Sequence, residues 1–311
     1  MAYFDKYGVE FSDDRKILVR CPKDFKGEYI VPNEVTTIAA RAFCGCEYIT
    51  SVVIQNSVTE IDIYAFKNCK SLSLIDIPDS VTKIGGCAFE GCNSLTSLKL
   101  PDNITNIGFR TFANCKKLKS VILPASLTII RECAFLGCTN LSSIKIPQGV
   151  TNIKERAFAG CSSMTSINIP SSVTKIENRT FLGCQSLMSI ELPDTITDIE
   201  YGAFRECRSL RAIKLPSISS IRWQVFYGCS SLETVNIPEG VKSIDKESFL
   251  DCRCLKNIYI PSSIMCVAYG AFYGCDNIKY VYLPENQWER FTCIDEFKWA
   301  KFCVKGKVII S

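Results

Sequence analysis

The amino-acid sequence predicts a strand-dominated α/β solenoid, in which short coils stack one upon the next. Three features of a 23-residue unit predict it. A phenylalanine recurs at this spacing along most of the chain, a cysteine follows it three residues later, and an alternating apolar segment then ends at proline. A unit this short does not bury its apolar residues alone, so neighbouring coils must share one core.

The first 31 residues do not fit the repeat. Apolar residues at alternate positions flank a short polar segment in this region, which predicts a β-hairpin. They are Val9, Phe11, Ile17 and Val19. The terminal coil of a solenoid needs a cover for its open end. We therefore expect residues 1–31 to form an N-terminal cap.

A ladder of phenylalanines and cysteines defines the repeat. The phenylalanines are Phe43, Phe66, Phe89, Phe112, Phe135, Phe158, Phe181, Phe204, Phe226, Phe249 and Phe272. The cysteines are Cys46, Cys69, Cys92, Cys115, Cys138, Cys161, Cys184, Cys207, Cys229, Cys252 and Cys275. A spacing of three puts both side chains on one face of a short helical turn. The residue before the cysteine is Gly or Asn except at Glu206 and Asp251, which suits a left-handed backbone conformation.

An alternating segment follows each cysteine, as in Ser166–Pro170. Period two over four residues predicts a strand with one buried face, so Ile167 and Ile169 should be buried while Ser166 and Asn168 face outward. Proline ends this segment in every coil except the one that has Gln55. The strands of successive coils should therefore stack into a sheet.

The repeat resembles the leucine-rich repeats of the BspA type, whose unit reads approximately LxxIxIPxxVTxIGxxAFxGC. The resemblance covers residues 32–284 and implies a right-handed leucine-rich-repeat solenoid with a parallel sheet on its concave face. Members of this family are typically bacterial surface or secreted proteins that bind other proteins. The resemblance thus implies a cell-surface or secreted, adhesin-like ligand binder if a leader is missing from this chain. The N-terminal residues lack the apolar stretch of a signal peptide, so a cytoplasmic location is the alternative.

We expect a single solenoid domain over residues 1–311. It consists of the hairpin cap, eleven repeats in residues 32–284 and a C-terminal cap in residues 285–311. The C-terminal cap carries aromatic residues at roughly helical spacing, which should pack on the last coil or else form an aromatic binding site. They are Trp288, Phe291, Phe297, Trp299 and Phe302.

The chain has 19 cysteines and no histidine. The absence of histidine excludes Ser-His-Asp and Cys-His nucleophile systems and zinc sites that contain histidine. Neighbouring ladder cysteines lie near the lower limit of disulfide distance, but eleven parallel side chains do not pair off, and we expect reduced, buried thiols. The other cysteines show no CxxC spacing. No metal site and no cofactor are predicted.

The charge balance and the hydropathy of the chain limit the classes of function that we expect. The chain has 36 basic and 32 acidic residues, whereas a nucleic-acid binder usually has a stronger basic excess. No window approaches the roughly 18 consecutive apolar residues of a membrane span. The carboxylates are scattered, and no base accompanies a serine or cysteine, so no catalytic residues are predicted. We expect a non-enzymatic, monomeric protein whose partner is another protein.

The candidate partner-binding surface lies at the C-terminal end of the sheet. Strand alternation exposes tyrosines there beside lysines, which is the usual composition of an interface anchor. The predicted residues are Lys214, Lys256, Tyr259, Lys279, Tyr280 and Tyr282. The alternative is that these tyrosines pack on the C-terminal cap.

Two other functions remain open. One is a structural or self-assembling module, whose coils stack end to end or side by side. The weaker one is polyanion or glycan binding by basic residues of the sheet, namely Lys99, Lys119, Lys145, Arg211 and Lys214. The step from Phe204 to Phe226 is 22 residues instead of 23. Trp223 lies on the return side of this shortened coil, where it should fill the irregularity or else bind a partner.

Overall fold

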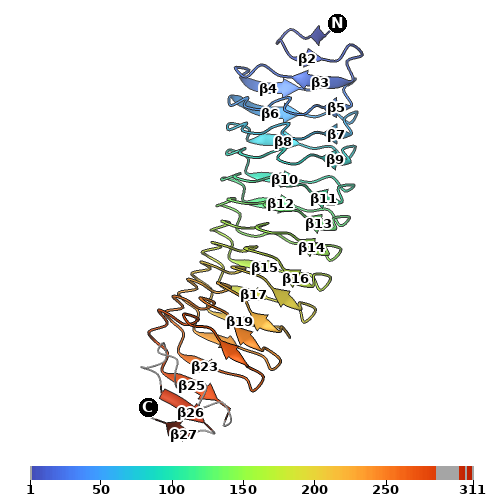
Figure 1. Ribbon diagram of the computed structural model, residues 1–311. Helices are drawn as coiled ribbons and strands as arrows, with labels where there is room; N and C mark the ends of the chain where they lie inside the picture. Colours follow the sequence, from blue (N-terminus) through green and yellow to red (C-terminus); the bar gives the residue numbers. More distant parts are fainter. Residues whose placement is uncertain (1, 285–300, 305–306, 310–311) are drawn as a thin grey trace. The chain divides into compact units, whose positions relative to one another are not determined.

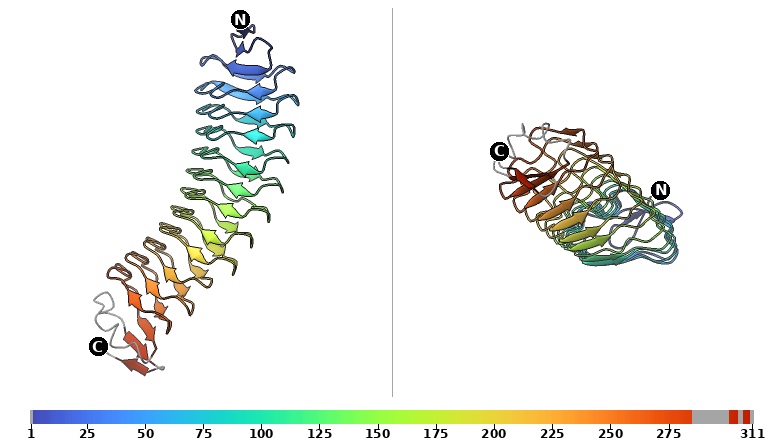
Figure 2. Two further views of the ribbon diagram at one scale, coloured as in Figure 1. Left: turned by 45° about the vertical axis from the view of Figure 1, so that its right-hand side comes forward. Right: turned by 90° about the horizontal axis from the view of Figure 1, so that it is seen from below.

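The computed structural model describes residues 2–284 and the backbone of residues 301–304 and 307–309 (Figure 1). The chain divides into two compact units, Met1–Ser163 and Met164–Ser311. In each unit the backbone winds as a solenoid in which almost every turn adds one short strand before the ladder phenylalanine and one long strand after the ladder cysteine (Figure 2). The repeat strands pair in parallel within each unit, which confirms the predicted strand-dominated solenoid.

Unit 1 contains two stacks of parallel strands. The long strands are β4 (Gly27–Ile30), β6 (Ile49–Val53), β8 (Leu74–Asp76), β10 (Ser97–Lys99) and β12 (Ser120–Ile122). The short strands are β5 (Thr37–Ile38), β7 (Glu60–Ile61), β9 (Lys83–Ile84), β11 (Asn106–Ile107), β13 (Ile129–Ile130) and β14 (Asn152–Ile153). Residues one repeat apart pair directly, as Ser51 does with Leu74.

The N-terminal residues of unit 1 form an antiparallel segment. Its strands are β1 (Tyr3–Phe4), β2 (Glu10–Phe11) and β3 (Ile17–Arg20). Strands β2 and β3 make a hairpin, and β3 then pairs in parallel with β5 of the first repeat. Val9, Phe11 and Leu18 are buried. The hairpin therefore continues the short-strand stack through the pairing of β3 with β5.

Unit 2 repeats the same arrangement. The long strands are β15 (Ser166–Asn168), β17 (Ser189–Glu191), β19 (Ala212–Lys214), β21 (Thr234–Asn236), β23 (Asn257–Tyr259) and β25 (Tyr280–Leu283). The short strands are β16 (Lys175–Ile176), β18 (Asp198–Ile199), β20 (Ser220–Ile221), β22 (Ser243–Ile244) and β24 (Cys266–Val267).

Two further strands follow the last repeat. Strand β26 (Lys301–Val304) pairs in parallel with β25, and β27 (Lys307–Ile309) pairs with β26 in the antiparallel direction. Phe302 thus belongs to a strand rather than to a helix. The other aromatic residues expected in the C-terminal cap, from Trp288 to Trp299, lie outside the described residues.

The phenylalanine ladder forms the centre of the core in each unit. Every ladder phenylalanine is at most 1% exposed. In unit 1 the ring centroids of neighbours from Phe43 to Phe158 lie 4.9–5.6 Å apart, with the rings nearly parallel. In unit 2 the distances from Phe181 to Phe272 are 5.0–5.7 Å. This stack is the shared core that the repeat predicts.

The cysteine ladder has a role that its sequence pattern does not reveal. Nine of the ladder thiols donate a hydrogen bond to the carbonyl oxygen of the phenylalanine one coil earlier, at 3.0–3.3 Å. That carbonyl also accepts the backbone N–H of its own coil's cysteine, as Phe66 O accepts Cys69 N–H at 3.2 Å and the Cys92 thiol at 3.2 Å. The thiols are therefore hydrogen-bond donors as well as core residues.

The segment between the short strand and the cysteine is a chain of single turns. The N–H groups of Tyr64, Phe66 and Asn68 donate to carbonyls of the next coil, whereas those of the residues between them close turns within their own coil. Two left-handed residues interrupt each segment. The first lies two positions before the phenylalanine, and the second immediately precedes the cysteine. An α-helix requires negative φ at every residue, so these residues end it after a single turn. The described residues accordingly contain no helix, and the predicted helical turns are reduced to single turns.

The residue before each ladder cysteine is left-handed, which confirms the prediction for the coils with Gly or Asn and extends it to the two exceptions, Glu206 and Asp251. A side chain at this position lies over the equivalent residue of the next coil. A Cβ on Gly91 would be 2.4 Å from Oδ1 of Asn68, and one on Gly137 would be 2.6 Å from Oδ1 of Asn114. In the sequence, no two successive coils both carry a side chain here. Glycine thus provides both the backbone conformation and the space.

We expect the substitution Phe112→Ala to lower the free energy of unfolding by about 3–5 kcal/mol, because it leaves a cavity in a fully buried ring stack. Urea unfolding measures the loss. Phe109→Ala is the matched control, since Phe109 is 48% exposed and should cost less than about 1 kcal/mol. Equal losses in the two variants would contradict this account of the core.

We expect the ladder thiols to resist alkylation in the native protein, because burial raises the pKa of the Cys115 thiol to about 12 and only the thiolate reacts. Cys254 and Cys266 are exposed and should react quickly. Site-resolved mass spectrometry after iodoacetamide treatment measures both rates, and denatured protein provides the full count of 19 thiols. Rapid native labelling of Cys115 and Cys138 would show that the ladder is not a packed core.

Candidate protein-binding surface

The long strands present alternate side chains to solvent. In β17, for example, Ile190 is buried while Ser189 and Glu191 are exposed. We call the surface formed by these outward residues the strand face. Because the repeat strands pair in register, equivalent residues of successive coils form columns across this face. Each unit carries one distinctive cluster on its strand face.

The first cluster contains the predicted tyrosines, at the last repeats of unit 2. Tyr259 of β23 pairs in register with Tyr282 of β25, and their rings stack with centroids 4.3 Å apart at 5°. Tyr280 contacts Tyr282 at 6.2 Å with a tilted ring. Tyr259 is 54% exposed and the other two are half-buried. We call these three residues the tyrosine cluster.

Two of the predicted lysines lie beside this cluster. The Nζ atom of Lys256 is 2.8 Å from a carboxylate oxygen of Glu233, and this hydrogen bond raises the pKa of Lys256. Lys279 lies one coil later, where its N–H donates to the carbonyl of Lys256. Both side chains are exposed. The cluster thus combines a fixed aromatic surface with exposed cations.

Lys214 lies apart from the tyrosines. It stands in β19 in the same column as Tyr259, and Asn236 of β21 separates the two. Its Nζ atom is 4.0 Å from Asp194, and both side chains are more than four-fifths exposed. An ion pair this exposed contributes little to stability. Lys214 is therefore a peripheral member of the predicted set.

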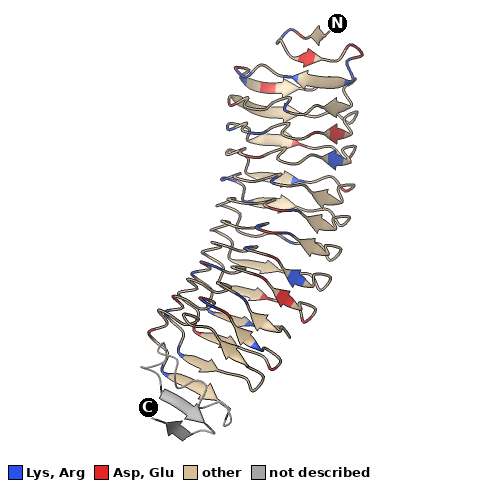
Figure 3. Cartoon of the chain, in the orientation of Figure 1, with Lys and Arg blue, Asp and Glu red and all other residues tan. Residues whose placement is uncertain are grey.

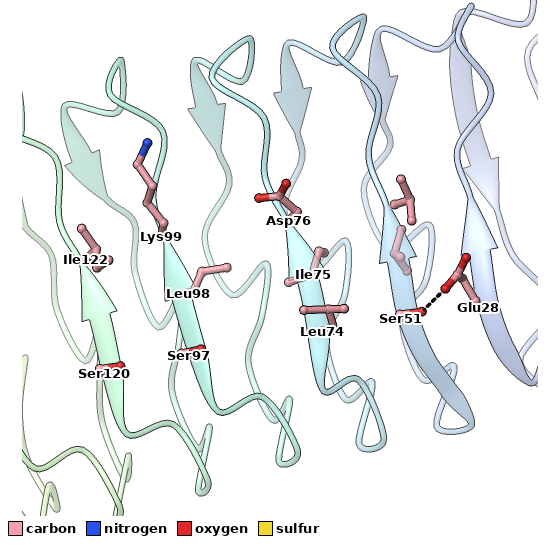
Figure 4. Close-up of a pocket in the computed structure, with 12 residues that line it drawn as sticks. Glu28, Ser51, Leu74, Ile75, Asp76, Ser97, Leu98, Lys99, Ser120 and Ile122 are labelled. Atoms are coloured by element: carbon pink, nitrogen blue, oxygen red, sulfur yellow. Dashed lines mark hydrogen bonds between the residues drawn. The ribbon is translucent and has the colours of Figure 1, made fainter.

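The second cluster is a groove in unit 1 that was not predicted from the sequence. It has a volume of about 550 Å³, and its lining includes Leu74 and Ile122, which are 67% and 63% exposed. Figure 4 shows Asp76, Lys99 and Ile122 toward one end of their strands and Leu74 toward the other end. We call this surface the apolar groove.

The sequence held a weak signal for this groove. Leu74 replaces the serine that otherwise fills its column from residue 51 to residue 143, and Ile122 stands between two lysines in the next column. These two departures are two coils apart. They become one surface only when the in-register pairing of the strands is known.

Basic and acidic residues are interspersed along the chain in both units (Figure 3). Lys99, a candidate for polyanion binding, has its Nζ atom 3.7 Å from Asp79, and Lys214 likewise lies near Asp194. These acidic neighbours reduce the attraction that the two lysines would exert on a polyanion.

Trp223 lies outside the strand face. Its ring stacks on Tyr201 at 4.7 Å, and its Nε1–H donates to Glu247 at 3.2 Å. Arg179 lies over the Tyr201 ring, 4.4 Å from its centroid. Although Trp223 is 45% exposed, it is tied to the coils on both sides.

Two further features concern metals and membranes. Within the described ranges, no three histidine, cysteine or acidic side chains gather in a way that could hold a metal ion. The same part of the chain contains no helix with the length and apolar character needed to span a bilayer.

Comparison with known proteins identifies the repeat. The sequence model of the BspA type leucine rich repeat region, which holds six copies of the repeat, matches residues 26–117, 59–188, 107–232 and 175–292. No significant match is found among curated proteins.

Solved structures of bacterial leucine-rich repeat proteins are similar to this chain. A leucine rich cell surface protein from Faecalibacterium prausnitzii is 29% identical, with 93% of this chain and 97% of that chain covered and a TM-score of 0.57. A leucine-rich repeat protein from Bacteroides ovatus is 27% identical, with coverage of 98% and 97% and a TM-score of 0.63. The T. pallidum leucine rich repeat protein is 30% identical over 58% of this chain and 87% of its own, with a TM-score of 0.52.

Proposed function

Because the chain belongs to the BspA-type leucine-rich repeat family, we propose that it is a non-enzymatic scaffold that binds another protein through its strand face. The observation that carries this proposal is the tyrosine cluster, with its stacked pair and adjacent lysines. Tyrosine provides a large contact area at low conformational-entropy cost, and its hydroxyl group can satisfy a partner's polar groups.

The contacts within the cluster support a binding role over a purely structural one. Tyr259 and Tyr282 hold each other in one orientation, so little side-chain freedom remains to be lost on binding. Tyr259 nevertheless keeps about half of its surface in contact with solvent, at 54% exposure. A residue that served only the core would be covered. The cluster is thus preorganised and available.

The apolar groove of unit 1 supports the same function. Monomeric proteins seldom expose large contiguous apolar patches, and those with polar rims mark interaction sites. Leu74 and Ile122 offer apolar contact, while Glu28, Asp76 and Lys99 surround them with charges of both signs. We treat the groove as a second contact region for a protein partner.

We further propose a cell-surface location for this binding activity. The supporting observation is the likeness to the F. prausnitzii protein, which is described as a cell surface protein and is similar over nearly its whole length. On this proposal the partner meets the protein outside the cell.

We expect the double substitution Tyr259→Ala with Tyr282→Ala to reduce capture of the partner at least tenfold, because it removes the stacked anchor. Quantitative pull-down from cell and host extracts, with wild-type and variant proteins compared by mass spectrometry, measures capture. Tyr269→Ala is the matched control, because Tyr269 is 80% exposed and lies off the strand face. Proteins retained equally by all three baits would count against the tyrosine cluster.

We expect Leu74→Ser with Ile122→Ser to weaken capture of the same partner while leaving the free energy of unfolding within about 1 kcal/mol, because both side chains are mostly solvent-exposed. The same pull-down reports binding, and urea unfolding reports stability. Ile30→Ser is the control, since Ile30 is 57% exposed and outside the groove. Undiminished capture by the groove variant would restrict the binding surface to unit 2.

A further inference from the structure

A polar groove lies along the turns of unit 2, next to the ladder cysteines of three successive coils. Its volume is about 310 Å³. The lining includes Glu206, Arg208, Gly228, Ser230, Asp251 and Arg253. These residues flank Cys207, Cys229 and Cys252, so they belong to the turns and not to the strand face. We call this feature the turn groove.

The turn groove contains the two departures from the Gly/Asn rule. Glu206 and Asp251 are the acidic residues that precede a ladder cysteine, and both are left-handed, with φ values of 61° and 60°. Glutamate seldom adopts this conformation, and seven coils have glycine at the same position. Other non-glycine residues of the turns, Glu247 among them, are also left-handed, so what distinguishes these two positions is the acidic side chain itself.

Each of these acids has an arginine two residues later. Arg208 Nε lies 2.9 Å from Glu206 Oε2, and Arg253 NH2 lies 3.1 Å from Asp251 Oδ1. The same carboxylate–guanidinium pair therefore occurs twice, in coils that are two steps apart. The strand spacing makes their separation on the order of 10 Å.

The coil between the two pairs has small residues. Gly228 and Ser230 occupy the positions that hold the acid and the arginine in the coils on either side. The Glu206 carboxylate lies over Gly228, because a Cβ there would be 3.1 Å from the carboxylate carbon. The Glu206 carboxylate therefore fills the space over Gly228, and the Ser230 hydroxyl donates to the carbonyl of Arg208 at 3.5 Å. The groove opens beside these groups, which form part of its lining.

The chemistry of the groove favours one kind of ligand. Two carboxylates and two guanidinium groups balance in charge, so a polyanion gains little there. Tyr227 is half-buried, and Arg205 covers its ring with a centroid distance of 4.3 Å, so it offers no open aromatic anchor for a protein. Each ion pair presents acceptor oxygens beside N–H donors, and a pair of adjacent hydroxyl groups can donate to the first and accept from the second.

We propose that the turn groove binds a neutral oligosaccharide, with each carboxylate–guanidinium pair holding the hydroxyl groups of a different sugar ring. The separation of the pairs requires a chain longer than one ring. This site is distinct from the strand face and from the strand-face lysines considered above. Its occupancy does not depend on the proposed protein partner.

The test is calorimetric titration of the full chain with neutral linear hexasaccharides, namely β-1,4-glucan, α-1,4-glucan, β-1,4-xylan and β-1,4-linked N-acetylglucosamine, and with a heparin hexasaccharide. We expect at least one neutral chain to bind, with an affinity that hardly changes with salt. Failure of every neutral chain to bind overturns the proposal. Binding of heparin alone, weakened steeply by salt, would make the groove an anion site and also overturns it.

Three variants connect binding to the groove. Arg208→Gln and Arg253→Gln should each weaken binding at least tenfold, whereas Arg211→Gln, which removes the same charge from an exposed residue outside the groove, should not. Glu206→Gly should weaken binding similarly while keeping or raising the midpoint of thermal unfolding, since it restores the glycine of the other coils. Unchanged binding in these variants, or a large fall in the midpoint for Glu206→Gly, would leave the groove with a structural role only.

Discussion

The structure depends on one carbonyl group per coil, that of the ladder phenylalanine. It accepts the N–H group that closes its own turn and the thiol of the following coil, so a single atom joins the local turn to the stack. The ladder phenylalanine and cysteine side chains near this carbonyl are buried. Each such hydrogen bond contributes modestly to the stability of the fold, but it recurs between successive coils.

Much of the fold follows from the sequence because its signals are local and repeated. Apolar alternation predicts which strand residues are buried, and the spacing of Phe158 and Cys161 predicts that both side chains face the core, which they do. The absence of a continuous helix was harder to foresee. It results from left-handed residues such as Arg110 and Arg156, whose side chains give no indication of a positive φ. Hydrogen bonds between coils hold these residues in the left-handed conformation. The sequence of a single repeat does not reveal those hydrogen bonds.

The candidate surfaces were less predictable, because each arises where a coil departs from its neighbours. The positions of the tyrosines follow from strand alternation, but the stacking of Tyr259 on Tyr282 depends on exact rotamers. The apolar groove joins Leu74 to Ile122 across the one coil between them, so neither residue indicates it alone. Glu206 and Asp251 were recognisable as exceptions, yet their pairing with arginines appears only in three dimensions. In this repetitive chain, the candidate binding surfaces lie where single coils depart from the repeat.

The alternation of glycine and side chain before the ladder cysteines has a consequence for how such a chain lengthens. The side chain of Asn68 occupies the space that a side chain at Gly91 would need, and Asn114 does the same over Gly137. Deleting the coil that contains Gly91 would therefore bring two asparagines into neighbouring positions. Coils that have glycine at this position can follow one another, as those of Gly137, Gly160 and Gly183 do, whereas a coil with a side chain here needs a glycine coil on each side. Such a chain can therefore lengthen one glycine coil at a time.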